Sequence, residues 1–597
     1  MDWNHELLAS LTWLVIAFAI SIAGLSLAAV LLARRTPWGR QLYRLAWPYF
    51  KPSRGGWLPL AWLALIVFMT LFAVRINVLF SFWYNGFYSA LQNLDSKAFW
   101  LLLIVFTVLA AVHVARSLLE FYLREAFQIR WRIWLTDTML DRWFADQAYY
   151  RSRYVADNAD NPDQRIQQDV ELFVASSVEL SMGLLKAVVS LFSFTLILWG
   201  LSGTLALFGL ELPRAMVFLV YLYVIIATVF AVWIGRPLVL LNFMNEKLSA
   251  NFRYALVRLR EYGESIAFFR GEPVERANLV TRFAAIIANR WQLIYRMLKF
   301  QGFNLSISQA AVVFPFIVQA QRFFSKEITL GDVMQTAEAF GQVQDALSFF
   351  RDKYDEFAKY RAVLNRLTGF LDAMEAARDL PTAQIEDGAG RVAASALTVR
   401  TPAQALLVEN LNFALGQGAA LLIRGRSGVG KTTLLRAIAG LWPYAAGKVV
   451  RPAGTQTLFL PQKPYLPLGT LRTALYYPLE AQPGERAAEV LRLCQLAHLI
   501  PRLDEEADWT GTLSLGEQQR LSIGRALLCK PQAVFLDEAS SAMDEGLEHA
   551  MYQLLREHLP QSILVSVGHR SSLLAFHTHE LELRGGGSWS MADLPQA

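Results

Sequence analysis

The stretch "LLIRGRSGVGKTTLLRAIAG", residues 421–440, decides the fold of the C-terminal third of the chain. An apolar strand leads into a glycine-rich turn, and a helix follows the turn. Such a turn directs backbone N–H groups inward, and the positive end of the following helix favours an anion. The stretch therefore predicts a phosphate-binding loop made of Gly425, Arg426, Ser427, Gly428, Val429, Gly430, Lys431, Thr432 and Thr433.

An acidic pair follows a second apolar strand in "PQAVFLDEASSAMD", residues 531–544. Within the loop described above, Lys431 is expected to neutralise the β and γ phosphates of ATP, and Thr432 to ligate Mg²⁺. Asp537 is then expected on the same Mg²⁺, and Glu538 where it polarises the attacking water. The alternative, an acidic helix cap, explains one carboxylate but not a pair that follows a phosphate loop.

Two further polar residues come at the ends of apolar runs. Gln462, in "LFLPQKPYLPLGTLR", lies at a suitable distance to contact Mg²⁺ and the γ-phosphate. His569, in "ILVSVGHR", is expected to contact the γ-phosphate, although a lone histidine after a buried strand is often structural. We therefore predict catalytic roles for Glu538, His569 and Gln462.

The stretch "TLSLGEQQR", residues 512–520, has two compatible interpretations. Ser514 and Glu517 have the spacing of a helix capping box. The same exposed helix N-terminus also favours an anion.

In order and spacing, these motifs resemble the nucleotide-binding domain of ATP-binding cassette (ABC) transporters over residues 395–580. The resemblance implies that Ser514, Gly516 and Glu517 form a signature loop, which caps the nucleotide held by a second subunit, and that Asp544 ends another loop of the site. One chain has one phosphate loop and one signature loop, so the resemblance implies a homodimer of half-transporters. Leu515 and Glu517 depart from the commonest signature, LSGGQ. Thr401 stands where many relatives have an aromatic residue that stacks on adenine.

Composition points to a membrane protein for the rest of the chain. The 597 residues exceed one ordinary domain, and 54% of them are apolar. The two cysteines, Cys494 and Cys529, have neither paired nor metal-ligand spacing, which suits a reducing compartment. Although the net charge is +6, the basic residues cluster beside apolar segments and no nucleic-acid motif accompanies them.

Seven stretches are candidates for membrane spans, since a span takes roughly 20 helical residues. They are residues 7–35, 57–82, 98–121, 179–203, 214–236, 302–324 and 329–352, the last being the least hydropathic. The first stretch ends in Arg34 and Arg35, and Arg40, Arg44, Lys51 and Arg54 follow it without an acidic residue, which places that connection in the cytoplasm. Seven crossings put everything after residue 360 in the cytoplasm. Two periodic polar stretches, near 122–178 and 237–300, predict helices that continue into the cytoplasm.

Several polar residues lie in or near these spans, where an ionised group is costly unless paired or hydrated. They are Arg75, His113, Arg116, Glu120, Glu179 and Lys186. For Arg75 we favour a hydrated translocation cavity, while for Glu120 and Glu179 the cavity and the membrane interface stay open. The aromatic residues Trp83, Tyr84, Phe87 and Tyr88 are interpreted as an interfacial belt in preference to a binding site.

The predicted fold is an all-α membrane domain followed by an α/β P-loop domain. The predicted divisions are an extra N-terminal helix with a basic elbow (1–56), a six-helix domain with two cytoplasmic hairpins (57–368), a linker (369–394) and an ATP-binding domain (395–597). This order of domains resembles the exporter-type ABC fold. The chain also resembles the SbmA/BacA-related transporters, which are kin of the peroxisomal fatty-acyl transporters. The motifs that carry this second resemblance are "IRWRIWLT", "NPDQRIQQDV", "LFSFTLILWGLSG" and "ESIAFFRG", the last around Glu264.

That resemblance implies a multi-pass protein of the bacterial inner membrane whose cytoplasmic ATPase drives uptake of bulky hydrophilic solutes such as cobalamin, peptides or bleomycin-like antimicrobials. Its expected cofactors are ATP and Mg²⁺, and its expected partners are a second copy of the chain, the lipid bilayer and the solute. A fatty-acyl or lipid-like substrate, or export, is the alternative. A soluble ATPase that moves nothing is disfavoured, because the spans are fused to the ATPase.

Overall fold

The computed structural model describes residues 3–51, 57–155, 161–207 and 210–595. The chain divides into two compact units. The helical unit comprises Met1–Asp141 and Ala159–Leu371, and the sheet unit comprises Arg142–Asn158 and Asp372–Ala597. Arg54, part of the predicted basic connection, lies outside the described residues.

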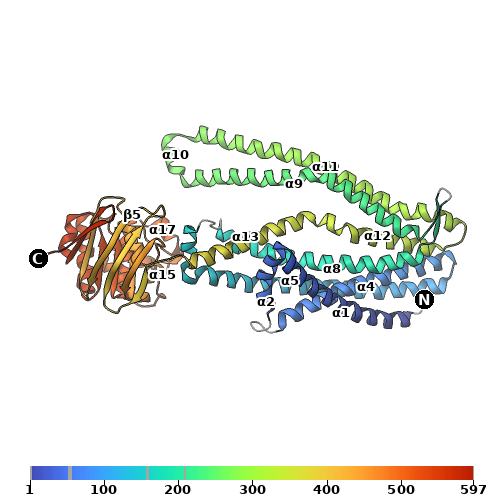
Figure 1. Ribbon diagram of the computed structural model, residues 1–597, viewed down its shortest axis with the longest axis horizontal. Coiled ribbons are helices and arrows are strands. Elements are labelled where there is room, and N and C mark those ends of the chain that lie inside the picture. The colour runs from blue at the N-terminus through green and yellow to red at the C-terminus, as the bar shows by residue number, and fades with distance from the viewer. Residues whose placement is uncertain (1–2, 52–56, 156–160, 208–209, 596–597) are drawn as a thin grey trace. The chain divides into compact units, whose positions relative to one another are not determined.

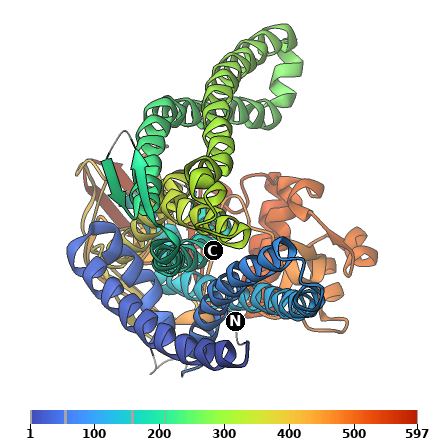
Figure 2. The ribbon, with the colours of Figure 1, turned by 90° about the vertical axis from the view of Figure 1, so that its right-hand side faces the viewer.

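Helices, most of them long, make up most of the helical unit (Figures 1 and 2). They are α1 (Trp3–Arg35), α2 (Pro37–Phe50), α4 (Leu58–Gln92), α5 (Ser96–Phe144), α7 (Pro162–Gln164), α8 (Val170–Leu201), α9 (Ala215–Glu261), α10 (Gly263–Phe269), α11 (Glu272–Phe324), α12 (Leu330–Asp352) and α13 (Tyr354–Arg378). A π-helical turn, η3 (Arg165–Asp169), joins α7 to α8. A hairpin of β1 (Thr204–Leu207) and β2 (Leu210–Pro213), which the sequence did not predict, separates α8 from α9.

Six helical segments in the described residues are long and apolar enough to cross a membrane, one fewer than the sequence predicted. They correspond to α1, α4, α5, α8, α9 and α11, while the seventh predicted span forms α12. Helix α12 carries polar residues such as Gln335, Glu338 and Asp345, which lower its hydropathy. It packs against α4, α8, α9 and α11, so neighbouring helices surround much of it.

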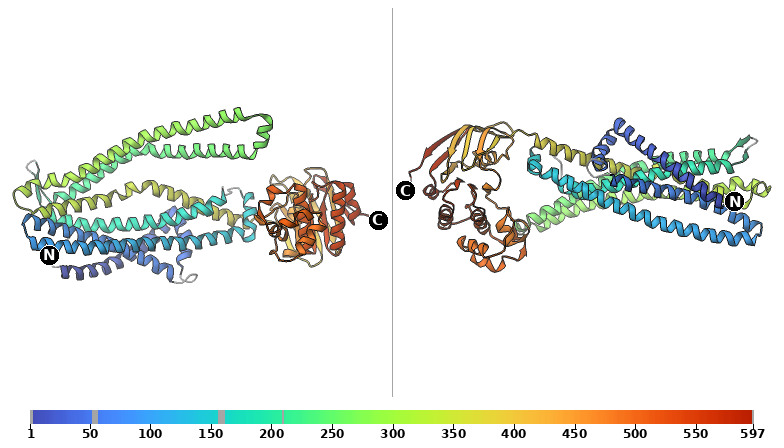
Figure 3. Two further views of the ribbon diagram at one scale, coloured as in Figure 1. Left: turned by 180° about the vertical axis from the view of Figure 1, so that it is seen from behind. Right: turned by 90° about the horizontal axis from the view of Figure 1, so that it is seen from below.

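Helices α9 and α11 run side by side as a long hairpin that ends at α10 (Figures 1 and 3). Their 47 and 53 residues exceed what a bilayer requires, as the periodic polar stretch predicted. Phe252 packs on Phe283 with ring centroids 5.7 Å apart, and the Asn289 side chain donates to the Leu241 carbonyl at 3.0 Å. These contacts hold the hairpin together well beyond its most apolar part.

Arg75 is buried and paired with α1 and lines neither of the two pockets described below, which departs from the preferred prediction of a hydrated cavity. Its guanidinium donates to Ser10 Oγ at 2.9 Å and to the Glu6 carboxylate at 3.1 Å, both on α1. The ring of Trp13 lies 5.8 Å from the guanidinium carbon. The additional N-terminal helix therefore supplies the counter-ion for a buried arginine of α4.

The other charged residues near the spans are mostly paired as well. Glu120 bridges Arg116 and Arg124 on α5, and Glu179 pairs with Lys353. Lys186 is exposed. Both carboxylates therefore have charged partners, and the choice between a cavity and the membrane interface stays open for Glu120 and Glu179.

The sheet unit contains a six-stranded sheet and a four-stranded sheet, in the orders β14-β13-β6-β12-β11-β8 and β3-β7-β4-β5. Its strands are β3 (Gln384–Asp387), β4 (Val392–Arg400), β5 (Leu406–Leu415), β6 (Ala420–Gly425), β7 (Ala445–Arg451), β8 (Thr457–Leu460), β9 (Gly469–Thr470), β10 (Glu506–Ala507), β11 (Ala533–Asp537), β12 (Ile563–Val567), β13 (His579–Gly585) and β14 (Ser588–Asp593). Its main helices are α14 (Lys431–Ile438), α15 (Leu471–Tyr476), α16 (Arg486–Leu493), α17 (Trp509–Thr512), α18 (Leu515–Cys529) and α19 (Glu545–His558).

Both faces of the six-stranded sheet are buried, as expected for a largely parallel sheet. Leu422 and Leu536 pack against α15, α16, α18 and α19 on one face. Leu421 and Phe535, which point to the other face, pack against α14 and the four-stranded sheet. Strands β8, β11, β12 and β6 are parallel neighbours, so their carboxyl ends meet at one edge.

Residues 369–394, predicted as a linker, contain regular structure over much of their length. They form the end of α13, strand β3 and the start of β4. Leu371, Met374 and Ala377 are buried at helical spacing, an apolar pattern that the polar neighbours obscured in the sequence. The division between the two compact units falls within this segment, after Leu371, and its role as a linker stays a prediction.

Candidate nucleotide site

The predicted phosphate loop joins β6 to α14 and depends on glycine at three positions. Gly425, Gly428 and Gly430 have φ values of +145°, +80° and +111°. A Cβ atom at Gly425 would lie 2.4 Å from the Leu583 carbonyl oxygen, so a side chain there would force β13 away. The exposed residues of the loop, such as Arg426, lie at the edge of the sheet where the parallel strands end.

Lys431 folds back over this loop. Its Nζ donates to the carbonyl oxygens of Gly425 and Arg426 at 3.0 and 3.1 Å. The residue is 6% exposed, and this burial lowers the pKa of Lys431. A buried ammonium group whose hydrogen bonds go to carbonyl oxygens is suited to an added anion, because the anion would strengthen the attraction that Glu538 and Asp537 already exert on it.

Thr432 and Asp537 are brought together as the motif spacing predicted. Thr432 Oγ1 donates to Asp537 Oδ1 at 2.9 Å, across the ends of α14 and β11. Burial raises the pKa of Asp537, while the Thr432 hydrogen bond opposes that shift. A hydroxyl, a carboxylate and the nearby Gln462 amide are hard oxygen ligands of the kind that Mg²⁺ prefers, so the residues fit that ion.

Glu538 lies between two of the other predicted residues. Gln462 Nε2 donates to Glu538 Oε2 at 2.9 Å, and His569 Nε2 lies 3.4 Å from Glu538 Oε1. Glu538 has a φ of +50°, and its backbone N–H donates to the Val567 carbonyl at 3.2 Å. This left-handed backbone turns the carboxylate toward Gln462 and His569 at the end of the parallel strands.

The signature stretch begins α18 with the predicted capping box. The Ser514 hydroxyl accepts from the Glu517 backbone N–H at 3.4 Å, and the Glu517 carboxylate accepts from the Ser514 backbone N–H at 2.9 Å. His498 Nε2 lies 2.9 Å from the same carboxylate. Burial raises the pKa of Glu517, but the hydrogen bonds from Ser514 and His498 outweigh it and lower the pKa overall.

The remaining predicted residues take ordinary structural positions. Val429 packs on the sheet core, Ser427 is exposed and Thr433 lies in the first turn of α14. Asp544 caps α19 by accepting from the Leu547 backbone N–H at 2.8 Å. Thr401 closes a turn by accepting from the Ala405 backbone N–H at 3.0 Å.

Gln519 is a functional candidate that the sequence prediction missed. It is fully buried, and its amide donates to the Gln462 carbonyl at 2.9 Å and to Ser541 Oγ at 3.2 Å. Its side-chain oxygen accepts from the Ala542 backbone N–H at 3.0 Å. One side chain therefore ties the signature helix to the segments that carry Gln462 and Asp544.

Residues 142–158 belong to the sheet unit although they follow a membrane helix in sequence. Tyr154 packs on Trp442 and Tyr444, with centroids 5.3 and 6.3 Å apart. Arg151 Nη2 donates to the Leu380 carbonyl at 2.6 Å. The end of the first predicted cytoplasmic hairpin is thus packed on the same unit as the phosphate loop.

Comparison with known proteins places both parts of the chain in one family. A family model for ABC transporter transmembrane region 2 matches residues 48–324, and the ABC transporter model matches residues 408–541. The chain belongs to the ABC transporter family. It is a multi-pass membrane ABC transporter with a cytoplasmic ATP-binding domain, and its ATPase activity is coupled to transport.

Full-length relatives support this assignment. The chain is 48% identical over 593 residues to an uncharacterized ABC transporter ATP-binding protein of Haemophilus influenzae, covering 99% of this chain and all of that one. It is 33% identical to the inner membrane ABC transporter ATP-binding protein YddA of Escherichia coli (89% and 92% covered). It is 29% identical to the human lysosomal cobalamin transporter ABCD4 (88% and 92% covered).

A solved structure confirms the exporter-type fold. A bacterial Atm1-family ABC exporter with ATP bound aligns with a TM-score of 0.67, covering 88% of this chain and 94% of that one, at 17% identity. The family models and the full-length relatives, rather than this structure, confirm the broad resemblance to ABC half-transporters related to the ABCD group. The narrower resemblance to SbmA/BacA-related transporters stays a hypothesis.

Proposed function

We propose that this chain is half of a homodimeric, ATP-driven transporter of the bacterial inner membrane that takes up bulky hydrophilic solutes such as cobalamin or peptides. The observation that carries the proposal is the joining, in one chain, of a phosphate loop with Glu538 beside Gln462 to six membrane-capable helices. We retain the functional divisions expected from the sequence, namely residues 1–56, 57–368 and 395–597, joined by the segment 369–394.

The site residues would divide the work of hydrolysis. Lys431 binds the β and γ phosphates in place of its present carbonyl partners. Thr432, Asp537 and Gln462 would hold Mg²⁺, which neutralises developing phosphate charge when it is bound. Glu538 orients and deprotonates the attacking water, and His569 contacts the γ-phosphate from the next strand.

A second copy of the chain would complete each site. In the described structure, the hydrogen bonds of the Ser514 side chain run to Glu517, within its own capping box. Phe268 and Phe269 on α10 are 79% and 85% exposed, which is unusual for adjacent large apolar residues. Both observations support a partner that covers the signature loop and the end of the α9–α11 hairpin.

The solute and direction rest on analogy with relatives. The name of human ABCD4 describes a cobalamin transporter, which supports a bulky hydrophilic solute. The alternative is a fatty-acyl substrate or export, favoured by the relation to the ABCD group. ATP binding drives either direction only through its higher affinity for one conformation of the dimer.

The test compares wild type with Glu538→Gln in cells that lack other uptake routes, using labelled cobalamin and a labelled proline-rich peptide. We expect ATP hydrolysis to fall about a hundredfold or more in Glu538→Gln, and uptake to be lost with it. Glu545→Gln is the matched control, because Glu545 is exposed on the first turn of α19. Unchanged uptake in Glu538→Gln would contradict the proposal. Absent uptake of both solutes by an active ATPase would favour the acyl or export alternative.

A further inference from the structure

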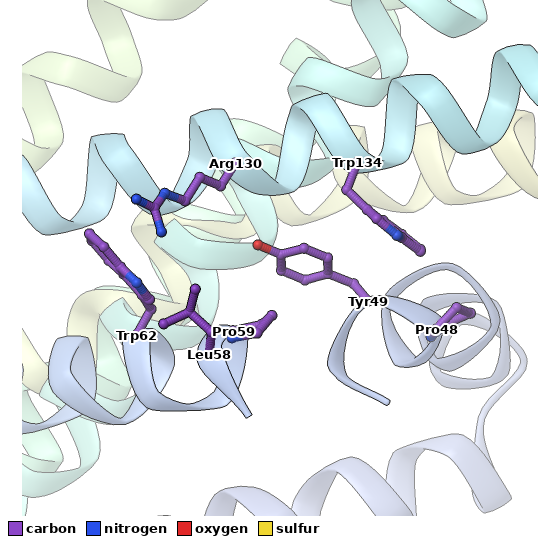
Figure 4. Close-up of a pocket in the computed structure, with 7 residues that line it drawn as sticks. All are labelled: Pro48, Tyr49, Leu58, Pro59, Trp62, Arg130 and Trp134. Carbon is purple, nitrogen blue, oxygen red and sulfur yellow. The ribbon is translucent and has the colours of Figure 1, made fainter. Parts of the chain in front are cut away.

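Two pockets among the described residues of the helical unit differ in size. The smaller has a volume of about 160 Å³ and lies between Tyr49, Trp62, Arg130 and Trp134 (Figure 4). The Arg130 guanidinium is 4.6 Å from the centre of the Trp62 ring, so it already has an aromatic partner. This volume is below the range of about 300–1,000 Å³ typical of pockets for small molecules.

The larger pocket has a volume of about 450 Å³ and lies between α4, α11 and α12. Asn85 fixes α4 to α12 beside it by donating to Asp332 Oδ1 at 2.9 Å and to Gln335 Oε1 at 2.8 Å. We call it the α4–α12 cavity. We propose that this cavity binds a cationic group of the transported solute, with an apolar or aromatic part of the solute beside it, as in a basic peptide.

One face of α12 lines the cavity. Glu338, Gly341 and Asp345 lie at positions three and four residues apart, which is the spacing of one helix face. A Cβ atom added to Gly341 would meet nothing within 4 Å. The centre of this α12 face is therefore open, with a carboxylate one turn away on each side.

These carboxylates form no close ion pair within the described part of the chain. Glu338 accepts a hydrogen bond from Gln342 Nε2 at 2.9 Å, while Asp345 is attracted by Lys186 and repelled by Glu338 and Asp352. Glu338 is half-buried and Asp345 is exposed. Both carboxylates are therefore accessible, and a cationic group in the cavity would offset the repulsion between them.

Two tyrosines complete the recognition surface from α4. Tyr84 and Tyr88 both line the cavity, and their rings are stacked with centroids 6.2 Å apart. Their ring faces attract cations and apolar groups, and their hydroxyls are hydrogen-bonding groups. Polyanionic acyl-CoA would instead be repelled by Glu338 and Asp345. This proposal rests on the proposed transport function, and it favours a cationic solute such as a basic peptide over the fatty-acyl alternative.

The test measures peptide binding to the full-length protein in lipid nanodiscs, without ATP. The probes are a fluorescein-labelled peptide rich in arginine and proline, and the same peptide with citrulline in place of arginine. We expect Glu338→Gln/Asp345→Asn to weaken binding of the arginine peptide about tenfold, which is about 1.4 kcal/mol, and to leave citrulline-peptide binding unchanged. We expect Glu327→Gln/Asp355→Asn to bind as wild type, since it removes two exposed carboxylates elsewhere.

A second variant tests the space without changing charge. Gly341→Leu would fill the open centre of the α12 face, and we expect it to weaken binding of the arginine peptide by at least tenfold. Equal affinity of the two peptides for wild type, absent binding, or tighter binding of palmitoyl-CoA than of the arginine peptide would overturn the inference. Because binding is measured without ATP, failure of ATP-driven transport would leave these results intact and count against the proposed function alone.

Discussion

Replacing Gln519 with methionine should slow ATP hydrolysis without removing the nucleotide site. The methionine side chain has a similar length and keeps the packing of the buried position, but it cannot make the three hydrogen bonds to Gln462, Ser541 and Ala542. Gln462 in turn donates to Glu538. Loss of the Gln519 amide therefore releases the segment that orients Glu538, while the phosphate loop stays in place.

Gln518 provides a matched control in the next position of the same helix. It is 5% exposed, and its amide donates to the carbonyl oxygens of Thr510 and Leu513 at 2.9 and 2.8 Å, away from Gln462. At a net value of about 1 kcal/mol for each hydrogen bond, Gln519→Met should lower the free energy of unfolding by about 3 kcal/mol and Gln518→Met by about 2 kcal/mol. The two variants thus differ little in stability.

Steady-state kinetics of the purified dimer distinguish the two. For Gln519→Met we expect kcat to fall about tenfold, equivalent to about 1.4 kcal/mol in the barrier, with the KM for ATP within about twofold of wild type. For Gln518→Met both constants should stay near wild type at a temperature where both variants are folded. Equal kcat values for the two variants would refute the positioning role of Gln519.

Two further predictions concern buried charges. Glu6→Gln should destabilise the helical unit by about 2 kcal/mol in a thermal melting experiment in detergent, because Arg75 keeps its bond to Ser10 but loses its carboxylate partner. The double variant Glu6→Gln/Arg75→Gln should recover part of the lost stability. An unchanged melting temperature in Glu6→Gln would show that the ion pair contributes nothing. His577 is buried, and burial lowers its pKa to about 4, so the unfolded chain takes up a proton first as the pH falls below about 6.5. The resulting loss is about 2 kcal/mol between pH 8 and pH 5 and should disappear in His577→Gln, as measured by thermal unfolding at both pH values; an equal loss in the variant would assign it to other groups.

The sequence placed Glu538, Gln462 and His569 in one site, but it did not predict their contacts with one another. In the structure Asp537 ends one parallel strand and Glu538 follows it, Gln462 follows its neighbour β8, and His569 follows β12 on the other side. Parallel neighbours end at one edge of a sheet, so residues just beyond their ends lie close together. The strand order, which the motif spacing does not give, therefore sets the contacts of Gln462 and His569 with Glu538.

The partner of Arg75 could not be predicted in the same way. Helices pack through faces that the sequence leaves ambiguous when all faces are apolar, and Glu6 lies 69 residues away in another helix. The aromatic cluster shows the same limit. Trp83 Nε1 donates to the Leu102 carbonyl of α5 at 2.7 Å, and Phe87 and Tyr84 pack against the same cluster. Tyr84 and Tyr88 also line the α4–α12 cavity, so the sequence spacing alone did not separate these surroundings.

Gln519 was missed for a different reason. A polar residue beside a family motif is easily read as part of the exposed signature, although the spacing of Gln519, Ser522, Ile523 and Ala526 is that of a buried helix face. A glutamine on such a face needs hydrogen-bond partners, and that requirement was the available signal. The polar ends of the 369–394 segment concealed a buried helix face in the same manner.

Glu517 gives the signature loop a charge that a glutamine at this position would not carry. Its lowered pKa keeps the carboxylate ionised at neutral pH, and it accepts from the Ser514 backbone N–H and from His498 at the N-terminus of α18. In the proposed dimer, a phosphate of the partner's nucleotide would approach this helix N-terminus, so the two anions would compete for the same positive helix end. Lys431 of the partner's phosphate loop would help to offset that repulsion when the two copies close. In the proposed dimer the capping box would therefore do more than begin a helix, because Glu517, which completes the box begun by Ser514, would add to the electrostatic cost of bringing the two halves of the site together.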